Sequence, residues 1–162
     1  MNNADLEKSF IEMIRLNDRL IYKVCSLYIS DDRSLEDLYQ DAVCNLWVAY
    51  PKFRHESSVS TWIYRVALNS CISELRKKKN KPQNVAFAGL QDAFIQPEDI
   101  TTDIEEMYRL IHQLKKIERA VILLYLEEKS YQEIATITGL TVSNVAVKLK
   151  RIKEKLVKMS NQ

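Results

Sequence analysis

The chain has 162 residues, a formal net charge of +2, and only two glycines and three prolines. Tight hairpins need glycine at positive φ, so this composition excludes a many-stranded sheet and predicts a nearly all-helical protein. The hydrophobic content of 46% excludes wholesale disorder, and no apolar run approaches the roughly 20 residues that span a bilayer. The first residues lack the basic and apolar regions of a secretory signal, so we expect a cytoplasmic protein without membrane insertion.

Charges are sorted along the chain by sign. The net charge is −4 over residues 1–50, +6 over 51–81, −6 over 82–106, +1 over 107–140 and +5 over 141–162. Two basic blocks separated by an acidic one indicate two anion-binding surfaces with a link between them. The alternative is that the charges are ordinary solvated helix faces.

Two helices are predicted in the first 51 residues. Apolar side chains at three- and four-residue steps predict one continuous helix over residues 5–29. Ser34 is suited to cap a second helix, which Pro51 stops. The apolar stripe of this second helix comprises Leu35, Leu38, Ala42, Leu46 and Ala49.

A polar loop over residues 52–60 leads into a third helix, predicted from Thr61 to Lys79. One stripe of this helix combines an aromatic ring, amide and guanidinium groups, and comprises Trp62, Arg65, Asn69, Ser73 and Arg76. Such a stripe suits stacking and backbone contact with an unpaired nucleic-acid strand. For Trp62 the alternative is packing in the core.

Residues 82–101 have no clear hydrophobic period and are predicted to be a flexible linker. Thr102 with Glu105 matches a capping box for a fourth helix that runs to about Leu114. A fifth helix is expected over residues 118–126.

The strongest motif is a helix-turn-helix that begins at Ser130. Ser130 with Glu133 forms a second capping box, which opens a short helix over residues 131–138. Ala135 is small where two helices cross, and Gly139 follows four residues later at the turn. Ile134, Leu140 and Val145 are expected to seal the joint between the two helices.

The last helix is predicted from Val142, capped by Thr141, to about Met159. Its apolar face comprises Val142, Val145, Leu149, Ile152 and Leu156, and its polar face comprises Asn144, Lys148, Arg151, Lys155 and Lys158. The polar face has side chains for phosphates and for base edges, and its N-terminal half should enter the major groove. For Lys155 and Lys158 the alternative is simple solubility.

The sequence offers no catalytic or metal-binding pattern. Cys25, Cys44 and Cys71 lie far apart without a CxxC pair, and they are expected to be buried, reduced thiols. No nucleophile–base set, paired carboxylates or phosphate loop is present, so we expect neither an enzyme, nor a cofactor, nor a metal.

In its order of motifs the chain resembles the sigma-70 family of bacterial transcription initiation factors, in particular its extracytoplasmic-function (ECF) group. The residues that carry the resemblance are those of segments 35–41, 53–54, 60–69, 76–77 and 130–156, together with Leu114 and Arg119. The resemblance implies a region 2 helical bundle over residues 1–81, the linker over 82–101, and a region 4 helix-turn-helix domain over 102–162.

The resemblance also implies partners and site residues. Core RNA polymerase would be bound through its β′ clamp helices by Asp37, Gln40 and Asp41, and through its β flap by the fourth and fifth helices. The residues implied for the −10 element are Phe53, Arg54, His55, Ser58, Trp62, Arg65, Asn69, Arg76 and Lys77. Those implied for the −35 element are Ser143, Asn144, Ala146, Val147, Lys148 and Arg151. An anti-sigma factor is a further partner that the resemblance implies.

The sequence departs from the family pattern in the last helix. Ala146 and Val147 stand where the family commonly has polar or basic residues, and they could contact a thymine methyl but cannot donate hydrogen bonds. Recognition would therefore rely on Asn144, Lys148, Arg151 and DNA shape. Two rival interpretations are a stand-alone helix-turn-helix regulator of duplex DNA and a helical adaptor protein.

Overall fold

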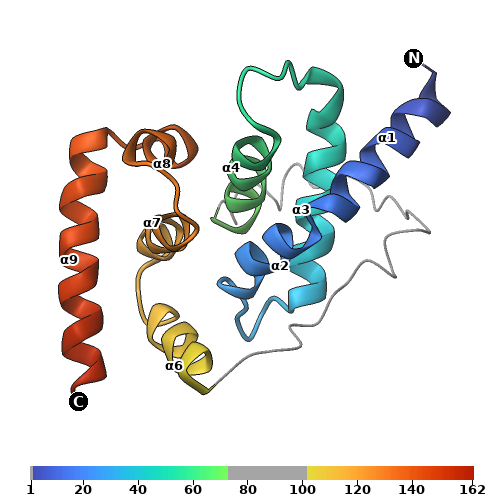
Figure 1. Cartoon of the computed structure of the whole chain (residues 1–162). Coiled ribbons are helices and arrows are strands. Elements are labelled where there is room, and N and C mark those ends of the chain that lie inside the picture. The colour runs from blue at the N-terminus through green and yellow to red at the C-terminus, as the bar shows by residue number, and fades with distance from the viewer. Residues whose placement is uncertain (1, 73–101) are drawn as a thin grey trace. The chain divides into compact units, whose positions relative to one another are not determined.

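The computed structural model describes residues 2–72 and 102–162, with side chains from residue 105 onward in the second range. Every regular element in these ranges is helical, which confirms the all-α class (Figure 1). The chain divides into two compact units, residues 1–96 and 97–162. The predicted linker and residues 73–79 of the third helix lie outside the described residues. Among the described helices, none combines the length and apolar character needed to cross a membrane.

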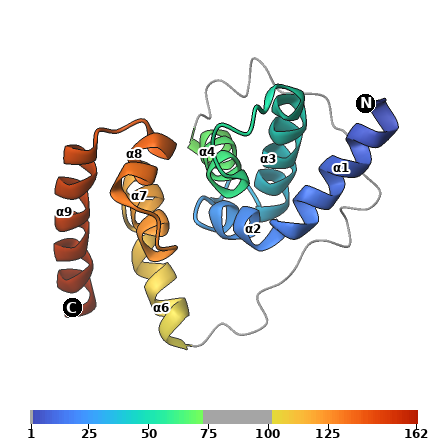
Figure 2. The same cartoon turned by 45° about the horizontal axis from the view of Figure 1, so that its top comes forward.

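The first unit is a helical bundle. Its elements are α1 (Asn3–Leu16), α2 (Asp18–Ser26), α3 (Leu35–Ala49), a short 3₁₀ turn (Tyr50–Lys52) and α4 (Val59–Ile72). Helices α2, α3 and α4 all pack against one another, as Figures 1 and 2 show. The largest fully buried side chains of this unit are Phe10, Ile14, Ile21, Leu27, Leu38, Leu46 and Ile63.

The prediction of one helix over residues 5–29 is wrong, because the chain breaks at Asn17. The backbone of Asn17 has φ −117° and ψ 18°, and its side-chain amide donates to the Met13 carbonyl at 2.8 Å. The break lets α1 place Phe10 against Trp47 and Tyr50, with ring centroids 5.1 and 5.3 Å apart. The apolar steps stay in phase across the break, so periodicity alone could not reveal it.

The break also places a carboxylate in the core. Asp18, at the start of α2, is only 2% exposed and accepts a hydrogen bond from the Tyr39 hydroxyl of α3. Burial, followed by the contact with Asp18, raises the pKa of the Tyr39 phenol far above its ordinary value. Tyr39 therefore remains a protonated donor at physiological pH.

Helix α3 follows the prediction closely. The Ser34 hydroxyl accepts from the backbone N–H of Asp37 at 3.2 Å, which confirms it as the cap. Pro51 lies in the 3₁₀ turn that ends the helix. Leu38, Ala42 and Leu46 are fully buried, as the apolar stripe predicted.

The second unit contains α6 (Thr102–Ile111), α7 (Lys116–Leu126), α8 (Tyr131–Thr138) and α9 (Val142–Ser160). Helix α7 packs on α8 and α9, and α6 also contacts α9. The Thr102 side chain lies outside the described residues, so its capping role stays a prediction.

Helix α6 ends three residues before the predicted Leu114. The guanidinium of Arg119 donates to the carbonyls of Leu114 and His112, at 2.9 and 2.8 Å, in the connection to α7. The Arg119 side chain thus supplies hydrogen bonds to backbone carbonyls that would have no partner at the end of a longer helix. This contact comes from the next helix, so local capping rules did not predict it.

The three cysteines are free and buried, which confirms their predicted packing role. Within residues 2–72 and 102–162, no group of three or more His, Cys, Asp or Glu side chains could hold a metal ion.

Candidate nucleic-acid and polymerase interfaces

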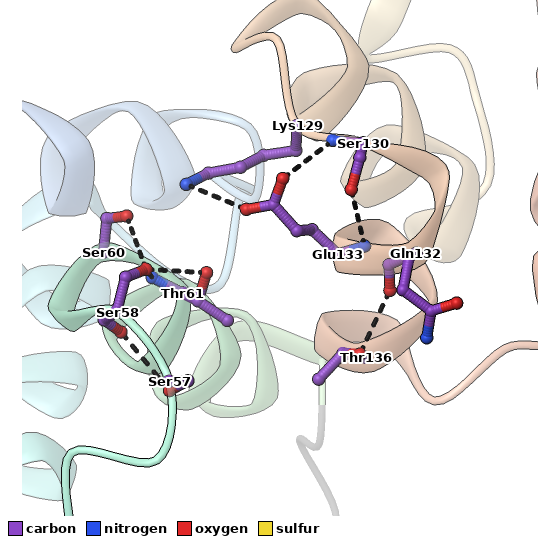
Figure 3. Close-up of polar contacts among 9 residues, drawn as sticks. All are labelled: Ser57, Ser58, Ser60, Thr61, Lys129, Ser130, Gln132, Glu133 and Thr136. Atoms are coloured by element: carbon purple, nitrogen blue, oxygen red, sulfur yellow. Dashed lines mark hydrogen bonds and ion pairs between the residues drawn. The ribbon is translucent and has the colours of Figure 1, made fainter.

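The helix-turn-helix forms with both predicted caps. The Ser130 hydroxyl accepts from the Glu133 N–H at 3.1 Å, and the Glu133 carboxylate accepts from the Ser130 N–H at 3.0 Å (Figure 3). This N–H lowers the pKa of Glu133, so the cap persists as a carboxylate contact. Gly139 ends α8 at φ +82°, and the Thr141 hydroxyl accepts from the Asn144 N–H at 3.1 Å to open α9.

The joint between α8 and α9 is sealed by the predicted apolar residues. Ile134 and Val145 are fully buried, Ala135 is 8% exposed, and Leu140 is half-buried. Since Ala135 is small and buried where α8 meets α9, the two helices approach closely. The helix-turn-helix geometry is therefore confirmed by the turn, the caps and the core.

One residue of the predicted apolar face of α9 is misplaced. Val145, Leu149 and Ile152 are buried, whereas Val142 is 41% exposed. Val142 is the first residue of the helix, and Cβ atoms tilt toward the helix N-terminus, so its side chain projects beyond the first turn. Val142 therefore joins the exposed end of the recognition helix.

The buried face of α9 defines which side points outward. At about 100° per residue, the direction opposite Val145, Leu149 and Ile152 is occupied by Ser143, Val147, Glu154 and Lys158, with Lys150 and Arg151 on either side. All six of these residues are exposed, whereas Lys148 is half-buried at the side. The predicted polar face was thus rotated by roughly a quarter turn.

Lys150 is an exposed cation on the outward side of α9 that the sequence analysis missed. The prediction followed four-residue steps from Asn144 through Lys148 and so selected one flank of the helix. The apolar residues of α9 are all visible in the sequence. A polar face centred directly opposite them would have included Lys150.

Two exposed lysines of α9 contact side chains of α7. The Lys155 ammonium lies 2.9 Å from the Glu118 carboxylate of α7, and the Lys153 ammonium donates to the Tyr125 hydroxyl at 2.9 Å. Lys153 also lies 4.1 Å from the centroid of the Tyr125 ring. These contacts help to hold α9 on α7, so Lys155 has a structural role beside the two predicted ones.

In the first unit, three rings stack at the loop before α4. Phe53 stacks on Trp62, with centroids 4.5 Å apart and planes at 13°, and the His55 ring lies 4.3 Å from Phe53. His55 has φ +57°, a left-handed conformation that is uncommon outside glycine. The stack fixes the path of a loop whose Arg54 and His55 side chains are exposed.

Ser58 caps α4. Its hydroxyl accepts from the Thr61 N–H at 3.1 Å and donates to the Thr61 hydroxyl at 2.9 Å (Figure 3). The helix starts at Val59, two residues before the predicted start, because this hydroxyl satisfies its first turn. Ser58, although exposed, therefore has a structural role beside the predicted DNA contact.

The predicted nucleic-acid stripe of α4 is only partly on the surface. Arg65 and Asn69 are exposed one turn apart, whereas Trp62 is 9% exposed and packs against Phe53. The alternative of core packing thus describes Trp62 better than an open stacking platform. Ser73, Arg76 and Lys77 lie outside the described residues.

The predicted polymerase-docking residues divide into two kinds. Asp37 and Gln40 are exposed on α3. Asp41 is paired with Arg33 at 3.1 Å, and each of these two side chains is only 15% exposed. Arg33 also donates to the Cys71 carbonyl of α4, so Asp41 participates in holding α3 near α4.

Fold and surface together define a two-unit helical protein with a helix-turn-helix in its second unit. Residues 13–81 match sigma-70 region 2, and residues 104–156 match sigma-70 region 4. The chain belongs to the sigma-70 family, in its ECF group, and is an alternative sigma factor for transcription initiation.

Curated relatives agree along nearly the whole chain. The ECF sigma factor SigW of Bacillus subtilis (strain 168) is 25% identical over 94% of this chain and 89% of its own. The ECF sigma-E factor of Escherichia coli (strain K12) is 25% identical over 91% of this chain and 84% of its own.

Two solved structures share the fold. A sigma factor RpoE of Bartonella quintana, in complex with the anti-sigma factor NepR, superposes with a TM-score of 0.71 at 21% identity, covering 95% of this chain and 98% of its own. CnrH, in complex with the cytosolic domain of CnrY, gives 0.66 at 19% identity, covering 98% and 94%.

Proposed function

We propose that this sigma factor binds core RNA polymerase, reads a −35 element with α9, and binds the opened −10 element with the loop and exposed face of α4. The observation that best supports this proposal is that each unit has its own exposed surface that contains a cation. Arg65 and Asn69 belong to the first unit, and Lys150 and Arg151 to the second. The proposed role is regulatory and non-catalytic.

The exposed surface of α9, called the upstream surface because it is proposed to read the −35 element, suits duplex DNA. Helix-turn-helix proteins place the N-terminal half of the second helix in the major groove. On α9 this half presents Ser143 and Asn144, and the following turns carry Lys150 and Arg151 for phosphates or guanine. The rival of a stand-alone regulator is not favoured, because regions 2 and 4 both match and together account for both units.

The loop before α4 and the exposed face of α4, called the downstream surface because they are proposed to bind the −10 element, suit an unpaired strand. Arg54 and His55 lie exposed on the loop before α4, and Arg65 and Asn69 continue along the helix. Capturing a flipped base costs a few kcal/mol of unstacking, so it needs a shaped site. The stack of half-buried Phe53 on Trp62 supplies a rigid support for such a site.

Run-off transcription with core polymerase on a promoter library tests the proposal. The full chain should direct core polymerase to a defined set of start sites, because its two surfaces recognise two elements. If the folded chain directs core polymerase to no start site on any template, the proposed function is wrong.

The docking surface has a matched pair of variants. Asp37→Lys should abolish co-elution with core polymerase, because it reverses charge at the proposed contact. Glu36→Lys makes the same charge change at the neighbouring exposed position, about 100° around the helix, and should leave co-elution intact. Equal behaviour of the two variants would remove the assignment to Asp37.

An anti-sigma factor is the further proposed partner. One structural neighbour is in complex with the anti-sigma factor NepR, and the other is in complex with the cytosolic domain of CnrY. Exposed apolar side chains such as Leu16, at 79%, and Val48, at 57%, are available on the first unit. Size-exclusion of material from the native host should yield a stoichiometric complex that is inactive in run-off assays. Consistent recovery of the active factor alone would count against this partner.

A further inference from the structure

The recognition helix is divided by charge along its length. Its first six residues expose only uncharged side chains, namely Val142, Ser143, Asn144, Ala146 and Val147. The cations begin at Lys148 and continue to Lys158. Because the N-terminal part of such a helix reaches base edges, the reading end of α9 has no arginine or lysine before its seventh residue.

Val147 is the last exposed residue of this reading end before the cations begin. Its side chain is 46% exposed and points away from the buried residues Val145 and Leu149. It shares one stripe with Ser143, one turn earlier, and Arg151, one turn later. A β-branched apolar residue here lowers helix propensity and keeps methyl groups in water.

We propose that Val147 recognises a thymine of the upstream element through the C5-methyl group of the base. Among the four base-pair orientations, only those with thymine present an apolar group in the major groove. The two methyls of Val147, with the Ala146 methyl beside them, would bury that group and exclude water from it. This inference rests on the proposed function, because it requires α9 to face duplex DNA.

Deoxyuridine substitution tests the contact directly, since it removes only the C5-methyl. The upstream element is first selected from a randomised library by run-off transcription with the full chain and core polymerase. Each thymine in it is then replaced by deoxyuridine on either strand. At one or two positions, the affinity of the wild-type holoenzyme for the promoter should fall about fourfold, as expected for one buried methyl.

The matching protein variant is Val147→Thr, which exchanges a methyl for a hydroxyl with almost no change in volume. It should occupy thymine and deoxyuridine templates equally. Val157→Thr makes the same exchange near the other end of α9, at a side chain that is 61% exposed, and should retain the wild-type preference.

The outcomes separate this inference from the function on which it rests. Efficient run-off with equal occupancy of thymine and deoxyuridine templates would overturn the role of Val147 and leave the sigma-factor function standing. A selected element without thymine, or a preference that persists in Val147→Thr, would also overturn it. Absence of run-off on every template would overturn both.

Discussion

Two carboxylates of the first unit are held inside the protein, and each joins two helices. Asp18 of α2 accepts from the Tyr39 hydroxyl of α3, and Asp41 of α3 pairs with Arg33, which also reaches the Cys71 carbonyl of α4. Breaking one partner of such a contact costs more than the contact contributes, because the remaining group stays desolvated. These residues therefore fix how the three helices meet.

Tyr39→Phe should destabilise the first unit by about 1–3 kcal/mol, because it removes a donor from a buried carboxylate while keeping the ring. Both tryptophans, Trp47 and Trp62, belong to this unit, so fluorescence-detected urea unfolding of the full chain reports on it alone. Tyr131→Phe, at an exposed tyrosine of the second unit, is the control and should leave the fluorescence transition unchanged. Equal transitions for Tyr39→Phe and wild type would show that the hydroxyl contributes nothing.

At the scale of the element, α9 depends on α7 as much as on α8. Burial alone would raise the pKa of Glu118, but the Lys155 ammonium and the Lys115 N–H outweigh it and lower this pKa below its ordinary value of 4.5. Glu118 thus opens α7, by accepting from the Lys115 N–H at 3.0 Å, and holds α9 with the same carboxylate. Its lowered pKa means that the folded unit favours the ionised form.

Glu118→Gln should lower the thermal stability of the second unit at neutral pH and lower it much less in acid. A carboxyl whose folded-state pKa is depressed stabilises above its unfolded pKa, and this contribution is lost as pH falls through the folded value. Hydrogen exchange of α7 and α9 amides between pH 7 and pH 4 measures the effect. Glu154→Gln, at an exposed position of α9, is the control. A deficit in Glu118→Gln that does not change with pH would contradict the assignment.

Gly139→Ala should destabilise the helix-turn-helix by about 1–2 kcal/mol through backbone conformation alone. A Cβ at this position meets no atom within 4 Å, so the cost comes from φ +82° and not from a clash. Gly139→Asn should cost less, because asparagine tolerates the left-handed region. Protection of α8 and α9 amides against hydrogen exchange ranks the three chains, and equal losses for Ala and Asn would point to a cause other than φ.

At the scale of the whole molecule, the two candidate interfaces belong to different units of one chain. Each unit has its own core, and the exposed residues of each interface lie on helices anchored in that core. Under the proposed function, the upstream surface positions the polymerase and the downstream surface stabilises the opened strand. The two steps should therefore respond to different substitutions.

Arg151→Ala should weaken formation of the initial promoter complex and reduce its salt dependence, because a phosphate or guanine contact is lost. Asn69→Ala should leave that complex intact and slow strand opening. Filter binding measures the first step, and permanganate reactivity of unpaired thymines measures the second. The free-energy effects of the two substitutions should add in the double variant, since the two residues belong to different units and contact different promoter elements. If both substitutions impair the same step, the two surfaces do not have separate roles in promoter binding and strand opening.

Local sequence signals were sufficient to predict the all-α class, the order of the helices after residue 30 within the described part of the chain, and the helix-turn-helix. Those features depend on local signals: scarce glycine, apolar periodicity, the Ser34, Ser130 and Thr141 caps, and Gly139 at the turn. Its family resemblance covered both units because the motifs stand in order along the chain.

Which polar side chains are available to a partner depends on how the helices pack. The burial of Trp62, the pairing of Asp41 with Arg33, which also contacts α4, and the contact of Lys155 with Glu118 each depend on packing against another part of the chain. Helical periodicity reports a direction around one axis, whereas exposure depends on which neighbour occupies that direction.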